Sequence, residues 1–485
     1  MNGGKRASPP RLGSVRAMRR TKIVATIGPA CNDIGTLERL VRAGMDVARL
    51  NFSHGTRRGH AETAQRLRTA AERADRPVAI LQDLPGPKLR IGDLRDGVVE
   101  LKPGEQITLC TGSTAVGDSR SMSVPWAGLC DALDIDEVVY LADGSIRLRV
   151  HAVRPGDGEV DTTVELGGVV SSHQGLNVPG ELAELPAVPE DDLDLLRFGE
   201  SIGVDLVALS FVRRPEDVQE VRRHTRLPLI AKIEKPQAMG AAEAILRVSD
   251  CVMVARGDLG IELPIVEVPI LQKRLLALAG ALARPSITAT QMLDSMVAST
   301  RPTRAEVADV ANAILDGTDA LMLSQETAVG AYPVESVEMM AAIAERTEHE
   351  APYERWNQER VRRDERDPAY TLAYNACSAA RELKLAALVI PTLSGRSARL
   401  ISAHRPEVPI YALSPGKETV RRCGLMWGVQ AARMRRHEVT EELIADAAAR
   451  ALEEGWVKRG DRIGITAGLP SGRPGTTSLF QVQDV

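Results

Sequence analysis

Short apolar runs alternate with longer amphipathic segments along most of this chain. The short runs are typical of buried strands and lie at residues 22–27, 46–51, 77–82, 205–210, 228–233, 250–254, 285–290 and 319–323. Helical patterns follow most of them, as at Leu37–Ala43, Pro215–His224 and Thr303–Leu315. Thr303 and Glu306 have the spacing of a capping box. Eight strands separated by helices predict an α/β fold, and eight parallel strands close a (β/α)8 TIM barrel.

A long segment of different character, residues 83–204, separates the third predicted strand from the fourth. Within it apolar and polar residues alternate, as at Val98–Leu101 and Ser145–Val150, and turn pairs such as Pro103-Gly104 and Asp143-Gly144 recur. This pattern predicts an inserted all-β domain, expected as a small β-barrel. Because the insertion leaves the barrel at the end of a strand, we expect it to form a lid over the barrel mouth.

The last third of the chain has its own α/β pattern. A charged stretch from Glu354 to Asp367 precedes predicted strands at 386–391, 409–413, 461–466 and 478–482. The expected organisation is therefore a disordered extension (1–17), a barrel (18–86 and 185–352), a lid (87–184) and a C-terminal α/β domain (353–485).

Composition excludes several functional classes. The net charge is −4 and aromatic residues make up 3%, so no basic, aromatic-rich surface for nucleic acid is expected. No apolar run reaches the length of a membrane span. The six cysteines are scattered and form no C-x-x-C pair, which favours reduced thiols in a cytoplasmic protein. The basic first twenty residues fit a solvated tail or, alternatively, a transit peptide.

Polar residues cluster where the predicted barrel strands end, which is where TIM barrels place catalytic groups. The strand ends carry Arg49 and Asn51, Asp83, Lys232 and Glu234, Gly257 and Asp258, Thr290, and Ser324 and Glu326. The Lys232–Glu234 pair alone could be a structural ion pair. Six strands that bring polar groups to one rim favour an active site, since buried charges need partners or a metal.

The residue types indicate a particular chemistry. Glu234 and Asp258 offer oxygen ligands from neighbouring strands, which suit Mg²⁺ or Mn²⁺ better than zinc. Arg49 and Lys232 offer positive charge to a phosphoryl group, and phosphoryl transfer depends mainly on positioning and charge stabilisation. Backbone amides near Asp258, with the Thr290 hydroxyl, could hold a carboxylate. The chain contains no Walker A motif, so a P-loop does not hold any nucleotide.

Longer motifs around these residues resemble one family. They are Thr21–Pro29, Arg49–Gly55, Met253–Gly260, Ala289–Leu293 and Arg301–Glu306. These motifs resemble pyruvate kinase, and the resemblance runs from about Arg19 to the C-terminus. It implies transfer of the phosphoryl group of phosphoenolpyruvate to ADP, giving pyruvate and ATP. It also implies a cytoplasmic, homotetrameric glycolytic enzyme under allosteric control.

The resemblance further implies a role for each matching residue. Lys232 would stabilise the transferring phosphoryl group and the enolate oxygen, Arg49 would hold the phosphoryl group, and Thr290 would line the proton-donor side. Glu234 and Asp258 would bind Mg²⁺. The remaining implied roles are a proton relay (Ser324 and Glu326), the carboxylate side of the substrate (Gly257 and Asp258) and the nucleotide side (Asn51, His54 and Arg90).

The monovalent-cation site of the family is altered in this chain. The resemblance assigns K⁺ to Asn51, Ser53, Asp83 and the carbonyl of Leu84. Members that need K⁺ carry glutamate near the start of the lid, whereas this chain has Lys88. An ammonium group there can supply the positive charge of K⁺, so we predict K⁺-independent activity. The alternative is that Lys88 is a solvated lid residue.

A second candidate site lies in the C-terminal domain. The segment from Pro391 to Ala398 follows a predicted strand and precedes a helical stretch. Its hydroxyls, glycine and arginine could form a phosphate cradle or simply an ordinary capped turn. The resemblance implies a phosphorylated effector there, a sugar phosphate or AMP, bound by Thr392, Ser394, Gly395, Arg396 and Ser397.

Two other functions fit part of the pattern. A metal-dependent aldolase or lyase could also use the two carboxylates and an arginine, but it would need neither Lys232 nor the lid. A non-catalytic metabolite sensor could keep the fold, but loss of Lys232, Glu234 or Asp258 would then be expected, and all three are present.

Overall fold

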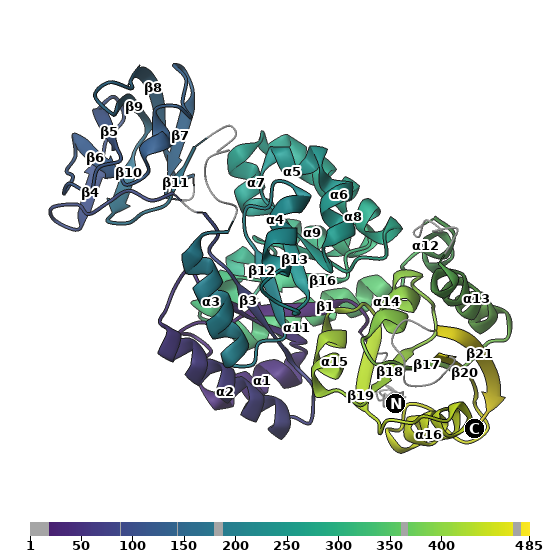
Figure 1. Cartoon of the computed structure of the whole chain (residues 1–485). Helices are drawn as coiled ribbons and strands as arrows, with labels where there is room; N and C mark the ends of the chain where they lie inside the picture. Colours follow the sequence, from purple (N-terminus) through teal and green to yellow (C-terminus); the bar gives the residue numbers. More distant parts are fainter. Residues whose placement is uncertain (1–18, 88, 143, 179–187, 360–366, 469–476) are drawn as a thin grey trace, which may run out of the picture.

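The structure is a computed structural model that describes residues 19–87, 89–142, 144–178, 188–359, 367–468 and 477–485. Lys88, Asp143 and the expected extension 1–17 lie outside these residues. Figure 1 shows the barrel in the centre, the inserted domain beyond one end of it, and the C-terminal domain at the other end.

Eight parallel strands form a closed barrel, so the predicted fold class is confirmed. Around the barrel the strands run β1, β16, β15, β14, β13, β12, β3 and β2. Their bounds are β1 Lys22–Thr26, β2 Val47–Asn51, β3 Ala79–Asp83, β12 Leu206–Leu209, β13 Leu229–Ile233, β14 Cys251–Ala255, β15 Ser286–Ala289 and β16 Ala320–Leu323. Each coincides closely with a predicted strand, because continuous apolar runs are characteristic of parallel strands buried on both faces.

Helices surround this barrel. They are α1 Ile34–Ala43, α2 Arg57–Arg73, α3 Glu190–Ser201, α4 Pro215–Arg222, α5 Pro236–Gly240, α6 Ala242–Val248, α7 Arg256–Glu262, α8 Val268–Ala281, α9 Arg304–Leu315, α10 Gln325–Ala328 and α11 Pro333–Glu348. The predicted capping box is present at α9, where Thr303 Oγ1 accepts the Glu306 N–H and the Glu306 carboxylate accepts the Thr303 N–H. Within the described residues, no helix combines the length and apolar character needed to cross a membrane.

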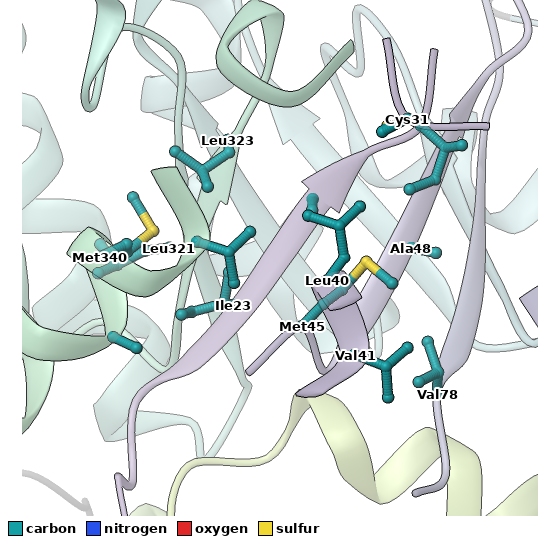
Figure 2. Packing of buried hydrophobic residues seen from close by; sticks show 14 of the residues in the cluster. Ile23, Cys31, Leu40, Val41, Met45, Ala48, Val78, Leu321, Leu323 and Met340 are labelled. Carbon is teal, nitrogen blue, oxygen red and sulfur yellow. The ribbon is translucent and has the colours of Figure 1, made fainter. Parts of the chain in front are cut away.

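The pleat of the strands divides the barrel into an outer and an inner core. Ile23 of β1 points outward and packs with Leu40 of α1 and Met340 of α11 (Figure 2). Its neighbour Val24 points inward and packs with residues such as Met253. Because alternate residues face the interior, the inward positions at the carboxyl ends of the strands form the barrel mouth.

The inserted domain is built mainly of β-strands, as expected, with one short 3-10 helix at Ala127–Leu129. Its strands are β4 Val98–Leu101, β5 Gln106–Thr111, β6 Ser121–Val124, β7 Val138–Leu141, β8 Ile146–Arg154, β9 Glu159–Leu166, β10 Gly168–Ser171 and β11 Leu176–Asn177. They form a six-stranded sheet (β11-β7-β8-β9-β5-β6) and a separate pair, β10-β4. Backbone pairing among the described residues does not close these sheets into the expected β-barrel, since β4 and β10 pair with each other.

The C-terminal domain holds a five-stranded sheet in the order β19-β18-β17-β20-β21, with only β21 antiparallel. Its strands are β17 Ala387–Pro391, β18 Ile410–Ser414, β19 Val429–Arg433, β20 Arg462–Gly468 and β21 Thr477–Asp484. Its helices are α13 Pro368–Glu382, α14 Arg396–Ala403, α15 Lys417–Arg422 and α16 Thr440–Glu453, and α12 Tyr353–Glu359 precedes them. The sequence analysis did not identify β19, whose side chains are mostly only half-buried.

Four aspartates stabilise the amino-terminal ends of the barrel strands. Asp46, Asp205, Asp250 and Asp319 each directly precede a strand. Each carboxylate accepts a backbone N–H at the start of the neighbouring strand, at 2.9 Å in all four cases. This repeated hydrogen bond sets the stagger between neighbouring strands at the amino-terminal end of the barrel.

Two of these aspartates also hold the C-terminal domain. Asp205 accepts the Arg421 Nε–H at 2.7 Å, and Asp319 Oδ1 lies 3.0 Å from Arg405 Nη1. The Arg405 side chain is fully buried, and its guanidinium lies 4.5 Å from the centre of the Trp427 ring. Two charge pairs, one of them fully buried, therefore hold the two domains together.

We expect Arg405→Met to destabilise the protein by about 3–5 kcal/mol, since it leaves Asp319 buried without its cation. Thermal unfolding followed by calorimetry would measure the change. Arg462→Met is a matched control, because the Arg462–Asp484 pair is exposed and solvent screens its attraction. Equal melting temperatures for the two variants would contradict the proposed strength of the domain contact.

Candidate active site

Four charged side chains from three strands meet at the barrel mouth. Arg49 Nε lies 2.7 Å from one oxygen of Asp83, and Lys232 Nζ lies 3.2 Å from the other. Lys232 Nζ also lies 2.9 Å from Glu234 Oε1. All four side chains are largely or fully buried. The structure thus brings together Arg49, Asp83, Lys232 and Glu234, all predicted at strand ends, with Asp83 between the two cations.

Mutual charge stabilisation keeps Asp83 and Lys232 ionised. Burial alone would raise the pKa of Asp83, but Lys232 and Arg49 outweigh it and hold that pKa below its ordinary value. Burial likewise favours neutral Lys232, yet Asp83 and Glu234 raise the pKa of its ammonium group above the usual range. Lys232 is therefore a permanent, nearly buried cation at the mouth of the barrel.

Sequence reasoning missed two residues that organise this cluster, Ser210 and Phe211. Lys232 Nζ donates to Ser210 Oγ at 2.7 Å, and that hydroxyl donates to the Leu84 carbonyl at 2.7 Å. The Phe211 N–H donates to Glu234 Oε2 at 2.7 Å. Ser210 could have been found, because it ends the predicted strand 205–210. Phe211 could not, since its part depends on a backbone φ of 56°, which bulky residues rarely adopt.

The tip of β15 is held in a strained conformation. Thr290 has a φ of 69°, which is unfavourable for a β-branched residue, and its hydroxyl accepts the Gly257 N–H at 2.8 Å. Arg256 Nη2 donates to the Thr290 carbonyl at 2.7 Å, while Arg256 Nη1 forms an ion pair with Asp309. Arg256 is a third organising residue that the sequence analysis did not single out. It holds Thr290 beside Gly257, and both residues were predicted to bind substrate.

Glu234 and Asp258 have the properties expected of a divalent-metal site. Burial raises the pKa of Glu234, Lys232 lowers it, and Asp258 raises it further, with a net increase. Glu234 Oε1 is buried and makes no well-aligned hydrogen bond. The described residues contain no group of three or more His, Cys, Asp or Glu side chains arranged as metal ligands. Two carboxylates completed by water and substrate fit Mg²⁺ or Mn²⁺.

Comparison with known proteins identifies the family to which this site belongs. The family model for the pyruvate kinase barrel domain matches residues 18–337, and the model for the pyruvate kinase alpha/beta domain matches residues 370–483. This chain belongs to the pyruvate kinase family. The resemblance inferred from the motifs is thereby confirmed, as is the assignment to the phosphotransferases.

Individual relatives agree with this assignment. A pyruvate kinase of Geobacillus stearothermophilus is 43% identical over 96% of this chain and 80% of its own length. A pyruvate kinase of Clostridium acetobutylicum is 38% identical over 96% of this chain and 100% of its own length. The crystal structure of a pyruvate kinase from Cryptosporidium parvum superposes with a TM-score of 0.89 at 33% identity, covering 96% of each chain.

The relay residues predicted from the pyruvate kinase resemblance lie beside one another at the end of β16. The Glu326 carboxylate is buried and accepts the Ser324 N–H at 2.6 Å and the Leu293 N–H at 3.1 Å. Burial raises the pKa of Glu326, which keeps the carboxyl group closer to a proton-carrying state. Gln325, which lies between the two relay residues, is exposed.

The residues expected on the nucleotide side are not brought into one contact network. Asn51 Oδ1 accepts the Ser53 N–H at 3.2 Å, and the exposed His54 binds His60 through its carbonyl. Arg90 lies on the inserted domain, where it donates to the His173 carbonyl at 2.9 Å. Among the described residues, no hydrogen bond or ion pair joins His54 or Arg90 to the Lys232 cluster.

The candidate effector loop connects β17 to α14. Gly395 has a φ of 83°, and its N–H donates to Thr392 Oγ1 at 3.0 Å. Arg396 begins the helix and forms an ion pair with Asp367. Ser394 is exposed and Ser397 is half-buried. The predicted effector residues therefore share one loop at a helix amino terminus, where backbone N–H groups favour an anion.

Proposed function

We propose that this chain transfers the phosphoryl group of phosphoenolpyruvate to ADP and protonates the resulting enolate to pyruvate. The observation that carries the proposal is the ionised Lys232, nearly buried between Asp83 and Glu234 at the mouth of the barrel. A preorganised cation in a dry site stabilises charge that develops on a phosphoryl group and on an enolate oxygen. Neither a metal-dependent aldolase or lyase nor a non-catalytic metabolite sensor would require this group.

Arg49 and Lys232 would act together on the phosphoryl group. Both side chains are 12% exposed and both are held by Asp83, so their positions are set before substrate binds. Thr26 Oγ1 accepts the Arg49 Nη1–H at 3.0 Å and restricts the guanidinium further. Preorganisation of this kind lowers the barrier because no reorientation is needed during the reaction.

Glu234 and Asp258 would hold Mg²⁺ or Mn²⁺, which supplies charge neutralisation to the phosphoryl oxygens when it is bound. The raised pKa of Glu234 supports this assignment, because a dication would replace the proton that burial favours. Thr290, beside Gly257, would face the substrate carboxylate and the proton-donor side. Ser324 and Glu326 would relay the proton.

We also propose that the activity does not require K⁺. The support is Lys88, which follows Gly86 and Pro87 where the chain enters the lid, close in sequence to the expected cation ligands Asp83 and Leu84. A lysine ammonium there would replace the charge of the monovalent ion.

A phosphorylated effector, a sugar phosphate or AMP, is proposed to bind the loop that contains Thr392, Ser394, Gly395, Arg396 and Ser397. The support is its position at the amino terminus of α14, together with one contact to the barrel-facing helix. Thr419 Oγ1 of α15 donates to the Leu393 carbonyl at 2.9 Å, and Arg421 of the same helix binds Asp205 of the barrel. An effector that shifted the loop would thus act on a helix already bound to the barrel.

A cytoplasmic homotetramer is the assembly we propose. Its support is an exposed apolar group, Ile265, Val266 and Ile270, on one side of the barrel around the start of α8. Such a patch is typical of a protein–protein interface.

The decisive test of the reaction is a coupled assay for ADP-dependent pyruvate formation. Lys232→Met should lower kcat by about 1,000-fold or more, because the charge that stabilises the transition state is lost. Chelation of divalent metal should abolish the wild-type rate. Full activity of the Met variant would refute the proposed role of Lys232.

Activity in K⁺, Na⁺ and tetramethylammonium buffers would test the monovalent-cation proposal. The wild-type rates should agree within about twofold, whereas Lys88→Glu should require K⁺, since it removes the substituting cation and adds an anion. Lys102→Glu, an exposed change elsewhere in the lid, is the matched control. Strong K⁺ stimulation of the wild type would overturn the proposal.

Phosphoenolpyruvate saturation curves with and without AMP, hexose phosphates and pentose phosphates would test regulation. At least one of these ligands should shift the wild-type curve to lower concentration. Ser394→Asp should abolish the shift, because a carboxylate in the loop repels phosphate. The control is Ser201→Asp, an equally exposed change on the barrel. Curves that respond to none of these ligands would count against an effector site.

A further inference from the structure

Asp192 makes a contact that the reaction as described does not use. It lies in the first turn of α3, the first helix after the inserted domain, and its side chain is almost completely buried. One carboxylate oxygen accepts the Gly86 N–H at 2.8 Å. The chain leaves the barrel for the lid at Gly86. The buried Asp192 carboxylate, which follows the lid in sequence, therefore holds the backbone that precedes the lid.

The backbone at Gly86 is packed tightly against the tip of β12. Gly86 has a φ of 71°, and a Cβ there would lie 2.8 Å from Ser210 Cβ and 2.9 Å from a ring carbon of Phe211. A side chain is therefore excluded, and the main chain approaches β12 directly. The bond from Asp192 holds the chain in this close approach.

The segment after β3 is in fact held at three successive points. Arg49 and Lys232 bind the Asp83 carboxylate, and Ser210 donates to the Leu84 carbonyl. Asp192 binds the N–H of Gly86. The first two anchors contact Lys232, the cation proposed to bind substrate. The third acts on the lid connection alone.

Burial of this carboxylate is energetically unfavourable. Desolvation raises the pKa of Asp192 to about 6, and the Gly86 N–H only partly offsets it. The charged groups that face Asp192 are Asp191 and Asp83, which disfavour its ionisation, and Lys232, which favours it. The protein would be more stable with an apolar residue at this buried position, unless its function needs the contact with Gly86.

We propose that Asp192 is a positioning residue for phosphoryl transfer: by holding Gly86, it orients the lid so that the nucleotide lies in line with the substrate at Lys232. This inference rests on the proposed phosphoenolpyruvate reaction at the Lys232 cluster. Transfer between two substrates depends steeply on their relative orientation, and part of the nucleotide side, Arg90, is on the lid. Protonation of the enolate depends on barrel residues only.

Two reactions of the full-length enzyme distinguish phosphoryl transfer, which should depend on the lid, from enolate protonation, which should not. One is ADP-dependent pyruvate formation from phosphoenolpyruvate. The other is exchange of the C3 protons of pyruvate in D₂O with Mg²⁺ and inorganic phosphate, followed by NMR. Asp192→Leu should lower kcat about tenfold or more and raise the KM for ADP. It should leave proton exchange within about twofold of wild type.

Conservative and neighbouring variants complete the test. Asp192→Asn should restore transfer, because its amide oxygen can accept the Gly86 N–H. Asp191→Leu, an exposed change in the same helical turn, should have no effect. If Asp192→Leu does not fold, Asp192→Ala replaces it. In Asp192→Leu, the peptide that contains Gly86 should exchange its amide hydrogens faster than in the wild type, as measured by mass spectrometry.

Three results would overturn the inference: equal losses in transfer and proton exchange, an unchanged transfer rate, or an Asn variant as impaired as the Leu variant. Lys232→Met should lose both reactions. If it retains both, the proposed reaction at Lys232 is wrong, and that failure is distinct from failure of the Asp192 inference.

Discussion

Closure of eight parallel strands is the constraint on which the whole site depends. In a closed barrel, alternate residues of every strand must face the interior, which apolar side chains fill over most of its depth. At the carboxyl ends these inward positions become Arg49, Asp83, Ser210 and Lys232, which follow the same register as Val47, Leu81, Ala208 and Ile230 one step below. The pleat that builds the core therefore also assembles the charged cluster.

Charge balance then determines what the cluster can do. Two cations share Asp83, and Lys232 also contacts Glu234, so no single charge is buried alone. The raised pKa of Glu234, to which Asp258 contributes, favours an additional cation there, whereas Arg49 and Lys232 favour an anion. A dication and a phosphate are the complementary partners, which is why family membership and electrostatics indicate the same reaction.

The sequence revealed those parts of the molecule that local patterns encode. Periodicity located every barrel strand, and the strand ends identified Arg49, Lys232, Glu234, Asp258 and Thr290. It could not reveal contacts between elements distant in sequence. Asp192 is a charged residue in a helical pattern and resembles a solvated position until the fold buries it against Gly86. Arg256 resembles part of a motif until it is seen holding the strained Thr290. The strand β19 was missed because its half-buried residues lack a continuous apolar run.

Two arginines of the C-terminal domain bind the amino-terminal end of the barrel, and these contacts affect the stability of the barrel itself. Arg405 and Arg421 neutralise aspartates that also set the stagger of the strands. A barrel expressed without the C-terminal domain would lose these two arginines. Two carboxylates at the amino-terminal ends of its strands would then be exposed. Gene fragments encoding the barrel alone should therefore make poor scaffolds for protein engineering, although every proposed catalytic group lies within them. The C-terminal domain is thus part of what stabilises the barrel.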